Sequence, residues 1–136
     1  MALQYRVISE WKYQLTADHT EDTAIASGDV GVAIDGYVTL HATGLLIVHA
    51  GYAWDGASGP ALDSKSSMRA SLVHDALYQL MREGALSWRW RKAADELLRD
   101  LAVAEGMPRW RAAYWYAAVR LFAGARAPRT SSLASK

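Results

Sequence analysis

Hydrophobic and polar positions alternate at the start of the chain. Over residues 4–16, apolar or aromatic side chains recur at nearly every second position, which is the period of a strand with one buried face. Three more aliphatic or β-branched runs follow, over residues 30–34, 37–40 and 45–48. Asp-Gly and Thr-Gly pairs, typical of tight turns, separate these runs. We therefore expect one small antiparallel sheet within about residues 4–50, interrupted by an aperiodic loop at 17–28.

The next segment, residues 51–60, is too rich in glycine for the interior of a strand or a helix. We expect a shaped loop here, with Trp54 exposed on it. A glycine-rich loop directly before a helix with a histidine is typical of a functional site. The candidate site residues of this loop are Trp54, Asp55, Gly56 and Ser58.

Helical spacing dominates the rest of the chain. The first predicted helix covers about residues 66–82 and ends at Gly84. A second is predicted over 88–105 with Ser87 as its N-cap, and a third begins after Pro108. The apolar stripes of the three helices are Met68, Leu72, Ala76 and Leu80; Ala94, Leu97, Leu98, Leu101 and Ala104; and Trp110, Ala113, Tyr114, Ala117 and Leu121.

Strands first and helices second predict an α+β fold rather than alternating βαβ units. A chain of 136 residues suits one domain. We place that domain at residues 1–124, with its three packed helices within about 66–123. Residues 125–136 are polar and basic, and we expect them to form a mobile tail.

Composition narrows the classes of function. Hydrophobic residues make up 51% and charged residues 21%, which are ordinary values for a globular protein. The formal net charge of +1 gives no bulk electrostatic case for nucleic acid as a partner. Cysteine is absent, so a metal would need histidine and carboxylate ligands. No signal peptide and no apolar run of about 20 residues is visible, so we expect no exported chain and no transmembrane segment.

The candidate chemistry centres on the adjacent residues His74 and Asp75, which lie mid-helix and point about 100° apart. His74 emerges beside Tyr78 on a largely apolar face, and the second helix offers Asp95 at the edge of its own apolar stripe. A buried carboxylate is tolerable only when it is paired, so we expect His74 to contact Asp95. That contact fixes the imidazole tautomer and leaves the other nitrogen as a general base toward water. The alternative is a core histidine that serves helix packing alone.

Asp75 is expected to turn toward the glycine-rich loop. There Asp55 and backbone carbonyls would complete a shell of oxygen ligands for a hard cation such as Ca²⁺. Alternatively, Asp75 bridges to Arg89 or Arg91, and Asp55 and Ser58 are plain turn residues. No role is assigned to the remaining histidines, His19, His41 and His49.

Tryptophan and tyrosine are crowded onto the last two predicted helices. We expect most of these rings to lie in the core. Because both faces of the third helix are aromatic and Arg109, Arg111 and Arg120 flank them, part of that surface is expected to pack on a partner protein or a second copy. A nucleic-acid platform is the less favoured alternative. The rings concerned are Trp88, Trp90, Trp110, Tyr114, Trp115 and Tyr116.

Three motifs follow one another: the run from Tyr52 to Pro60, then Arg69 with the run from Leu72 to Tyr78, then Arg91 with Ala94 and Asp95. This ordered combination resembles an uncharacterised family of small tailed-phage and prophage proteins, over about residues 37–122. The resemblance implies a phage or prophage origin and no settled function. It also implies phage structural proteins as partners, and a location in the host cytoplasm during infection or in the virion.

A more distant resemblance is to the secreted calcium-dependent phospholipases A2. The matching residues are His74, Asp75 and Tyr78 in a His-Asp-x-x-Tyr pattern on one helix and Asp95 on the next, and residues 116–122 look like the closing helix of bacterial members. The resemblance implies that His74 is the base, that Asp95 orients it, and that Asp75 and the preceding loop bind calcium. The chain lacks the cysteines of that class, and its loop does not reproduce the calcium-loop pattern.

Two functions are therefore expected. The first is a phage-encoded hydrolase with His74 and Asp95 as its general-base pair, which acts on an ester or amide bond of the host envelope during entry or lysis. Ca²⁺ is its candidate cofactor. The second is a non-catalytic virion, tail or assembly protein, in which the same residues are structural and the tryptophan-rich helices contact protein.

Overall fold

The computed structural model describes residues 3–9, 12–26, 31–56 and 65–123. In these residues antiparallel strands precede three α-helices, which confirms the α+β class. The predicted tail at 125–136 and the predicted site residue Ser58 lie outside the described residues.

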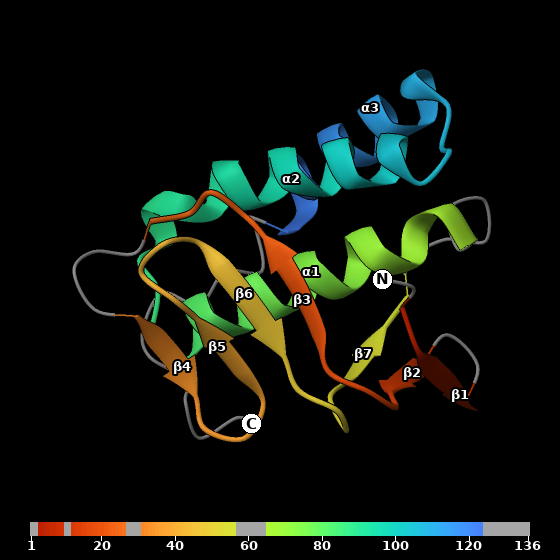
Figure 1. The fold of residues 1–136 in the computed structure, drawn as a ribbon. Helices are drawn as coiled ribbons and strands as arrows, with labels where there is room; N and C mark the ends of the chain where they lie inside the picture. The colour runs from red at the N-terminus through yellow and green to blue at the C-terminus, as the bar shows by residue number, and fades with distance from the viewer. Residues whose placement is uncertain (1–2, 10–11, 27–30, 57–64, 124–136) are drawn as a thin grey trace.

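The described strands form two antiparallel sheets rather than the single sheet expected from the sequence (Figure 1). The strands are β1 (Tyr5–Ser9), β2 (Lys12–Leu15), β3 (His19–Asp22), β4 (Val32–Ile34), β5 (Val38–Leu40), β6 (Leu45–Val48) and β7 (Ala53–Asp55). One sheet has the order β1-β2-β7 and the other the order β3-β6-β5-β4. The hairpins β4-β5 and β5-β6 form as predicted.

Two predictions about the strands are wrong. The single strand expected over residues 4–16 is an antiparallel pair in which Tyr5 lies opposite Leu15. The polar alternation runs through both strands, so its period alone does not reveal where the chain reverses. The loop expected at 17–28 holds β3. This strand was not predicted because the first three buried positions of the segment, His19, Glu21 and Thr23, are polar and conceal the strand period.

The glycine-rich segment contains a strand as well. In β7, Trp54 lies opposite Tyr13 of β2. The prediction that Trp54 is exposed is wrong, because its side chain is 2% exposed and belongs to the core. Its indole Nε1 donates a hydrogen bond to Ser71 Oγ at 3.1 Å. Trp54 therefore anchors the three-stranded sheet to the first helix. Gly56 directly follows the last residue of β7 and is partly exposed.

The helices end where the sequence predicts. Gly84 and Gly106 follow the first two α-helices with φ of 80° and 105°, a backbone conformation that glycine adopts without strain. Ser87 Oγ accepts a hydrogen bond from Arg89 N and so caps a 3-10 turn at the start of the predicted second helix, whereas the α-helix proper begins at Arg91 without a side-chain cap. The helices are α1 (Lys65–Arg82), the 3-10 turn η1 (Trp88–Trp90), α2 (Arg91–Ala104), α3 (Arg109–Ala118) and the π-helical turn η2 (Val119–Ala123).

Helix α1 lies across the strands, and α2 and α3 lie on its other side (Figure 1). Its predicted stripe is buried in a core that joins both sheets to the helices. The predicted stripe of α3 is exposed instead, because the helix buries Ala112 and Trp115 on its opposite face. Both faces are apolar, so the period cannot tell which one packs inward. Within the described ranges, no helix has the length and apolar character needed to cross a membrane.

Candidate functional site

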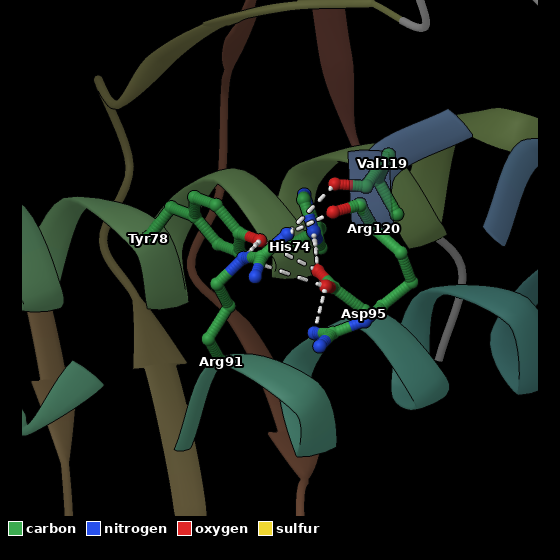
Figure 2. A network of polar contacts seen from close by, with 6 residues as sticks. All are labelled: His74, Tyr78, Arg91, Asp95, Val119 and Arg120. Atoms are coloured by element: carbon green, nitrogen blue, oxygen red, sulfur yellow. Dashed lines mark hydrogen bonds and ion pairs between the residues drawn. The ribbon is translucent and has the colours of Figure 1, made fainter. Parts of the chain in front are cut away.

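The contact between His74 of α1 and Asp95 of α2 is present. His74 Nε2 lies 2.7 Å from Asp95 Oδ1 (Figure 2). The two residues are 21 positions apart and come together because α1 and α2 pack against each other through their apolar stripes. The sequence prediction of this pair is therefore confirmed as a contact.

Asp95 is the centre of a larger network. Its side chain is fully buried, and Tyr78 Oη donates to the same Oδ1 at 2.7 Å while Arg120 Nη1 donates to Oδ2 at 2.8 Å. Burial by itself raises the pKa of Asp95, but the hydrogen bonds from His74, Tyr78 and Arg120 outweigh it and hold the pKa below its usual range. Asp95 is therefore a carboxylate acceptor at neutral pH.

Tyr78 and Arg91 complete this network from the other side. Burial and the neighbouring Asp95 raise the pKa of Tyr78, so its hydroxyl stays protonated and donates. Arg91 Nε donates to Tyr78 Oη at 3.1 Å and lies 3.9 Å from Asp95 Oδ2. Arg91 Nη2 also donates to the backbone carbonyls of Val119 and Arg120 (Figure 2). These bonds fasten η2 to the beginning of α2.

The His74 ring is held in one orientation. It lies 4.2 Å from the Tyr78 ring, measured between centroids, with a tilt of 34°. An ionised carboxylate can only accept hydrogen bonds, so Nε2 must carry the proton that faces Asp95. In the neutral ring this leaves Nδ1 with a free lone pair, and no described residue is hydrogen-bonded to Nδ1. The side chain is 12% exposed, so the ring reaches the surface while its partner does not.

Asp75 turns away from this network, as its neighbouring position on the helix requires. Its Oδ2 accepts a hydrogen bond from Tyr52 Oη at 2.6 Å. Burial raises the pKa of Asp75, and the bond from Tyr52 opposes that rise. The alternative bridge from Asp75 to Arg91 is not formed, because Arg91 is taken up by Tyr78, Asp95 and η2. Tyr52 directly precedes β7 and belongs to the glycine-rich segment 51–60. Asp75 therefore faces this segment.

Asp55 has a different neighbour. Its exposed carboxylate lies 3.4 Å from Lys12 Nζ across the β2–β7 pair. It is still near enough to Asp75 for its charge to raise the pKa of that carboxyl. Among the described residues, no three histidine, cysteine or acidic side chains are grouped to hold a metal ion. Calcium binding at Asp75 and Asp55 stays a prediction.

A second buried carboxylate was not predicted from the sequence. His19 Nε2 lies 3.0 Å from Glu21 Oε1 on β3, and Arg69 of α1 donates to both oxygens of Glu21, at 2.8 and 2.5 Å. Arg69 also donates to Glu105 at 2.8 Å. Burial raises the pKa of Glu21, but Arg69 and His19 outweigh this and lower the pKa to about 2. The network ties β3 to α1 and to the residue that follows α2.

Sequence reasoning also missed the arginines of the Asp95 network. Arg91 precedes Asp95 by four positions, a helical spacing that could have indicated an ion pair. Arg120 lies 25 positions from Asp95, and no local pattern marks it as a partner. Of the predicted site residues, the structure brings His74, Tyr78 and Asp95 together, and it places Trp54 in the core.

The fold and this site define a small α+β protein in which a partly exposed histidine contacts a buried aspartate between two helices. A family model described as "Protein of unknown function (DUF1353)" matches residues 34–119. The match covers more than half of the chain, and the chain therefore belongs to this family. This confirms the expectation of a family without assigned function. No curated protein and no solved structure matches the chain.

Proposed function

We propose that this protein is a phage-encoded hydrolase in which His74 is the general base and Asp95 orients it. The substrate class is an ester or amide of the host envelope. The observation that supports the proposal is the 2.7 Å contact between His74 Nε2 and the fully buried Asp95 carboxylate. Such a contact holds a histidine base in one tautomer.

The chemistry would use the nitrogen that points away from Asp95. A water molecule at Nδ1 gives up a proton as its oxygen attacks the carbonyl carbon of the substrate. The resulting imidazolium is stabilised by the Asp95 carboxylate, whose charge is kept by Tyr78 and Arg120. His74 then returns the proton to the leaving oxygen or nitrogen, so the sum of the steps is hydrolysis by one water.

A non-catalytic phage virion or assembly protein is the second candidate. The observation that favours it is the complete burial of Asp95, whose oxygens already accept hydrogen bonds from His74, Tyr78 and Arg120. A network that only fastens α2 to α1 and η2 needs the same bonds. The two candidates differ in what the free side of His74 does.

Replacement of His74 by glutamine separates the candidates. The glutamine amide can still donate to Asp95 from the position of Nε2, but it cannot accept a proton from water. We expect His74→Gln to lower the rate of hydrolysis by about 10²-fold or more, with a small change in melting temperature. The measurement is release of acid or amine from a fluorogenic phospholipid ester, a simple aryl ester and an isolated peptidoglycan fraction.

The matched control is His41→Gln. His41 is an exposed histidine between β5 and β6, and its replacement should leave the rate unchanged. If the unaltered protein hydrolyses none of the three substrates while His74→Gln lowers its stability, the non-catalytic candidate replaces the enzyme. Equal rates for the two variants would also refute a general base at His74.

A further inference from the structure

Helix α3 has two apolar faces, and only one of them packs on the protein. Successive residues of a helix are about 100° apart, so Ala112, Trp115 and Val119 share the inner face. Ala112 and Trp115 are buried. The opposite face remains uncovered, although it carries an apolar residue at each helical repeat. Its members are Trp110, Ala113, Tyr114, Ala117 and Leu121, called here the outer face of α3, and all five are exposed.

The outer face is large for an exposed apolar surface. Trp110 is 70% exposed, Tyr114 is 64% exposed and Leu121 is 69% exposed. Single exposed apolar residues are common on proteins, but a continuous stripe three turns long marks a binding surface. The stripe ends in η2, so it runs along the whole of the third helical segment.

Cationic side chains border this stripe on both sides. Arg109 and Arg111 stand about 100° to either side of Trp110 on the helix. Arg111 also lies over the Trp110 ring, with its guanidinium carbon 5.6 Å from the ring centroid. The sequence contains no acidic residue after Glu105. The charge of the border therefore favours an anionic partner over a cationic one.

A hollow of about 460 Å³ lies between α2 and α3, beside this border. Arg99 and Arg109 both line it, next to Ala113 of the outer face. Its one acidic residue, Asp100, already accepts a hydrogen bond from Arg99 at 3.0 Å. Arg109 is therefore the uncompensated cation of this hollow, which meets the apolar stripe at Ala113. The hollow is lined by Arg99, Asp100, Val103, Ala104, Arg109 and Ala113.

We propose that the outer face of α3 docks on an anionic phospholipid surface, with Trp110, Tyr114 and Leu121 inserted among the lipids and Arg109 and Arg111 at the headgroups. A second copy is the poorer occupant, because a twofold contact would set two purely cationic helices against each other. The chain beyond residue 123 is cationic too, so it does not complement the face. Nucleic acid would use the aromatic rings but would gain nothing from Ala113, Ala117 and Leu121.

A helix that lies in the membrane interface has the same composition. Tryptophan and tyrosine settle at the boundary between headgroups and acyl chains, and leucine enters the acyl region. The long arginine side chains extend from the border to the phosphates while the helix lies flat. This inference goes beyond the proposed hydrolysis, and binding is measured without any turnover.

The test is sedimentation of the full chain with vesicles of phosphatidylglycerol and phosphatidylcholine, and with vesicles of phosphatidylcholine alone. We expect binding to the anionic vesicles that weakens as salt is added. The triple variant W110S/Y114S/L121S should bind at least about tenfold more weakly, because the apolar area available for insertion is lost. R109Q/R111Q should bind more weakly and with less dependence on salt. Tyr37→Ser is the matched control, since Tyr37 is 56% exposed on the hairpin of β4 and β5.

Three results would overturn the proposal. One is an unaltered protein that stays in the supernatant with anionic vesicles. Another is equal weakening by Tyr37→Ser and by the triple variant. The third is self-association, or binding of a single-stranded oligonucleotide, that the triple variant abolishes while vesicle binding is absent. Of the five altered residues, four are exposed and Arg111 is partly exposed, and the control residue is exposed as well. The melting temperatures of the variants should therefore match that of the unaltered protein, which excludes misfolding as the cause of lost binding.

Discussion

Asp95 and Glu21 are two buried carboxylates whose surroundings differ in arrangement. Each lies beside a histidine and accepts hydrogen bonds from an arginine, and each has a pKa below its usual range. Around Asp95 the partners converge on one acid from α1 and η2, with a further arginine on α2. Around Glu21 the contacts form a chain, because Arg69 continues to a second acid, Glu105.

This difference determines how much stability each network loses when its acid is removed. Removal of Asp95 leaves several donors without their common acceptor, and two of its neighbours are arginines. Removal of the Glu21 charge leaves Arg69 with Glu105 as an alternative partner. A convergent network should therefore be more sensitive than a chain, and it should also hold its histidine more firmly.

The largest effect is expected for Asp95→Ala. The variant leaves His74, Tyr78 and Arg120 without an acceptor, so the free energy of unfolding should fall by about 3–5 kcal/mol. Denaturant unfolding at pH 7 measures this change. Asp100→Ala is the control on the same helix, where an exposed pair with Arg99 should contribute less than about 1 kcal/mol. Equal losses for the two variants would contradict the central position of Asp95.

The next effect is expected for Glu21→Gln, and it depends on pH. The pKa of Glu21 falls from 4.5 to about 2 on folding, so its ionised form stabilises the protein fully above about pH 4.5. That contribution is lost as the pH falls toward 2, since the native carboxylate then takes up its proton. A shift of this size corresponds to on the order of 3 kcal/mol. The free energy of unfolding of Glu21→Gln should therefore be lower than that of the unaltered protein at pH 7, and this difference should shrink steadily below about pH 4.5.

Unfolding curves of the variant and the unaltered protein from pH 7 to pH 2 test this prediction. Glu105→Gln is the control, because Glu105 is more exposed and its bond to Arg69 contributes little. A difference between Glu21→Gln and the unaltered protein that stays constant over this range would show that the charge of Glu21 is not what stabilises β3.

The same two networks show how far the sequence alone could lead. Helical spacing placed His74 and Asp95 on facing stripes, so their contact could be predicted. Glu21 could not be found in this way, because β3 buries polar side chains and hydrophobicity then carries no strand signal. Nor could the contact of Glu21 with Arg69 be predicted, because the two residues are 48 positions apart and meet only in the tertiary fold.

Long-range packing accounts for the other misses. The period of α3 marked two apolar faces, and only the position of α2 decides that Trp115 rather than Trp110 is buried. Arg120 contacts Asp95 because Arg91 binds the backbone of η2. No local sequence spacing predicts either contact. The chain reversal between β1 and β2 was not predicted, because the alternation of apolar and polar residues continues across it.

The smallest effect, expected for Tyr78→Phe, tests the convergence itself. The change removes one donor to Asp95 and keeps the buried ring, so the loss should be about 1–2 kcal/mol. Added to Asp95→Ala, it should cost almost nothing more, because the acceptor is already gone. Tyr52→Phe removes a hydroxyl from Asp75 in the same manner, and its loss should remain undiminished in the Asp95→Ala background. Full additivity of Tyr78→Phe with Asp95→Ala would mean that the Tyr78 hydroxyl stabilises the protein through Arg91 rather than through Asp95.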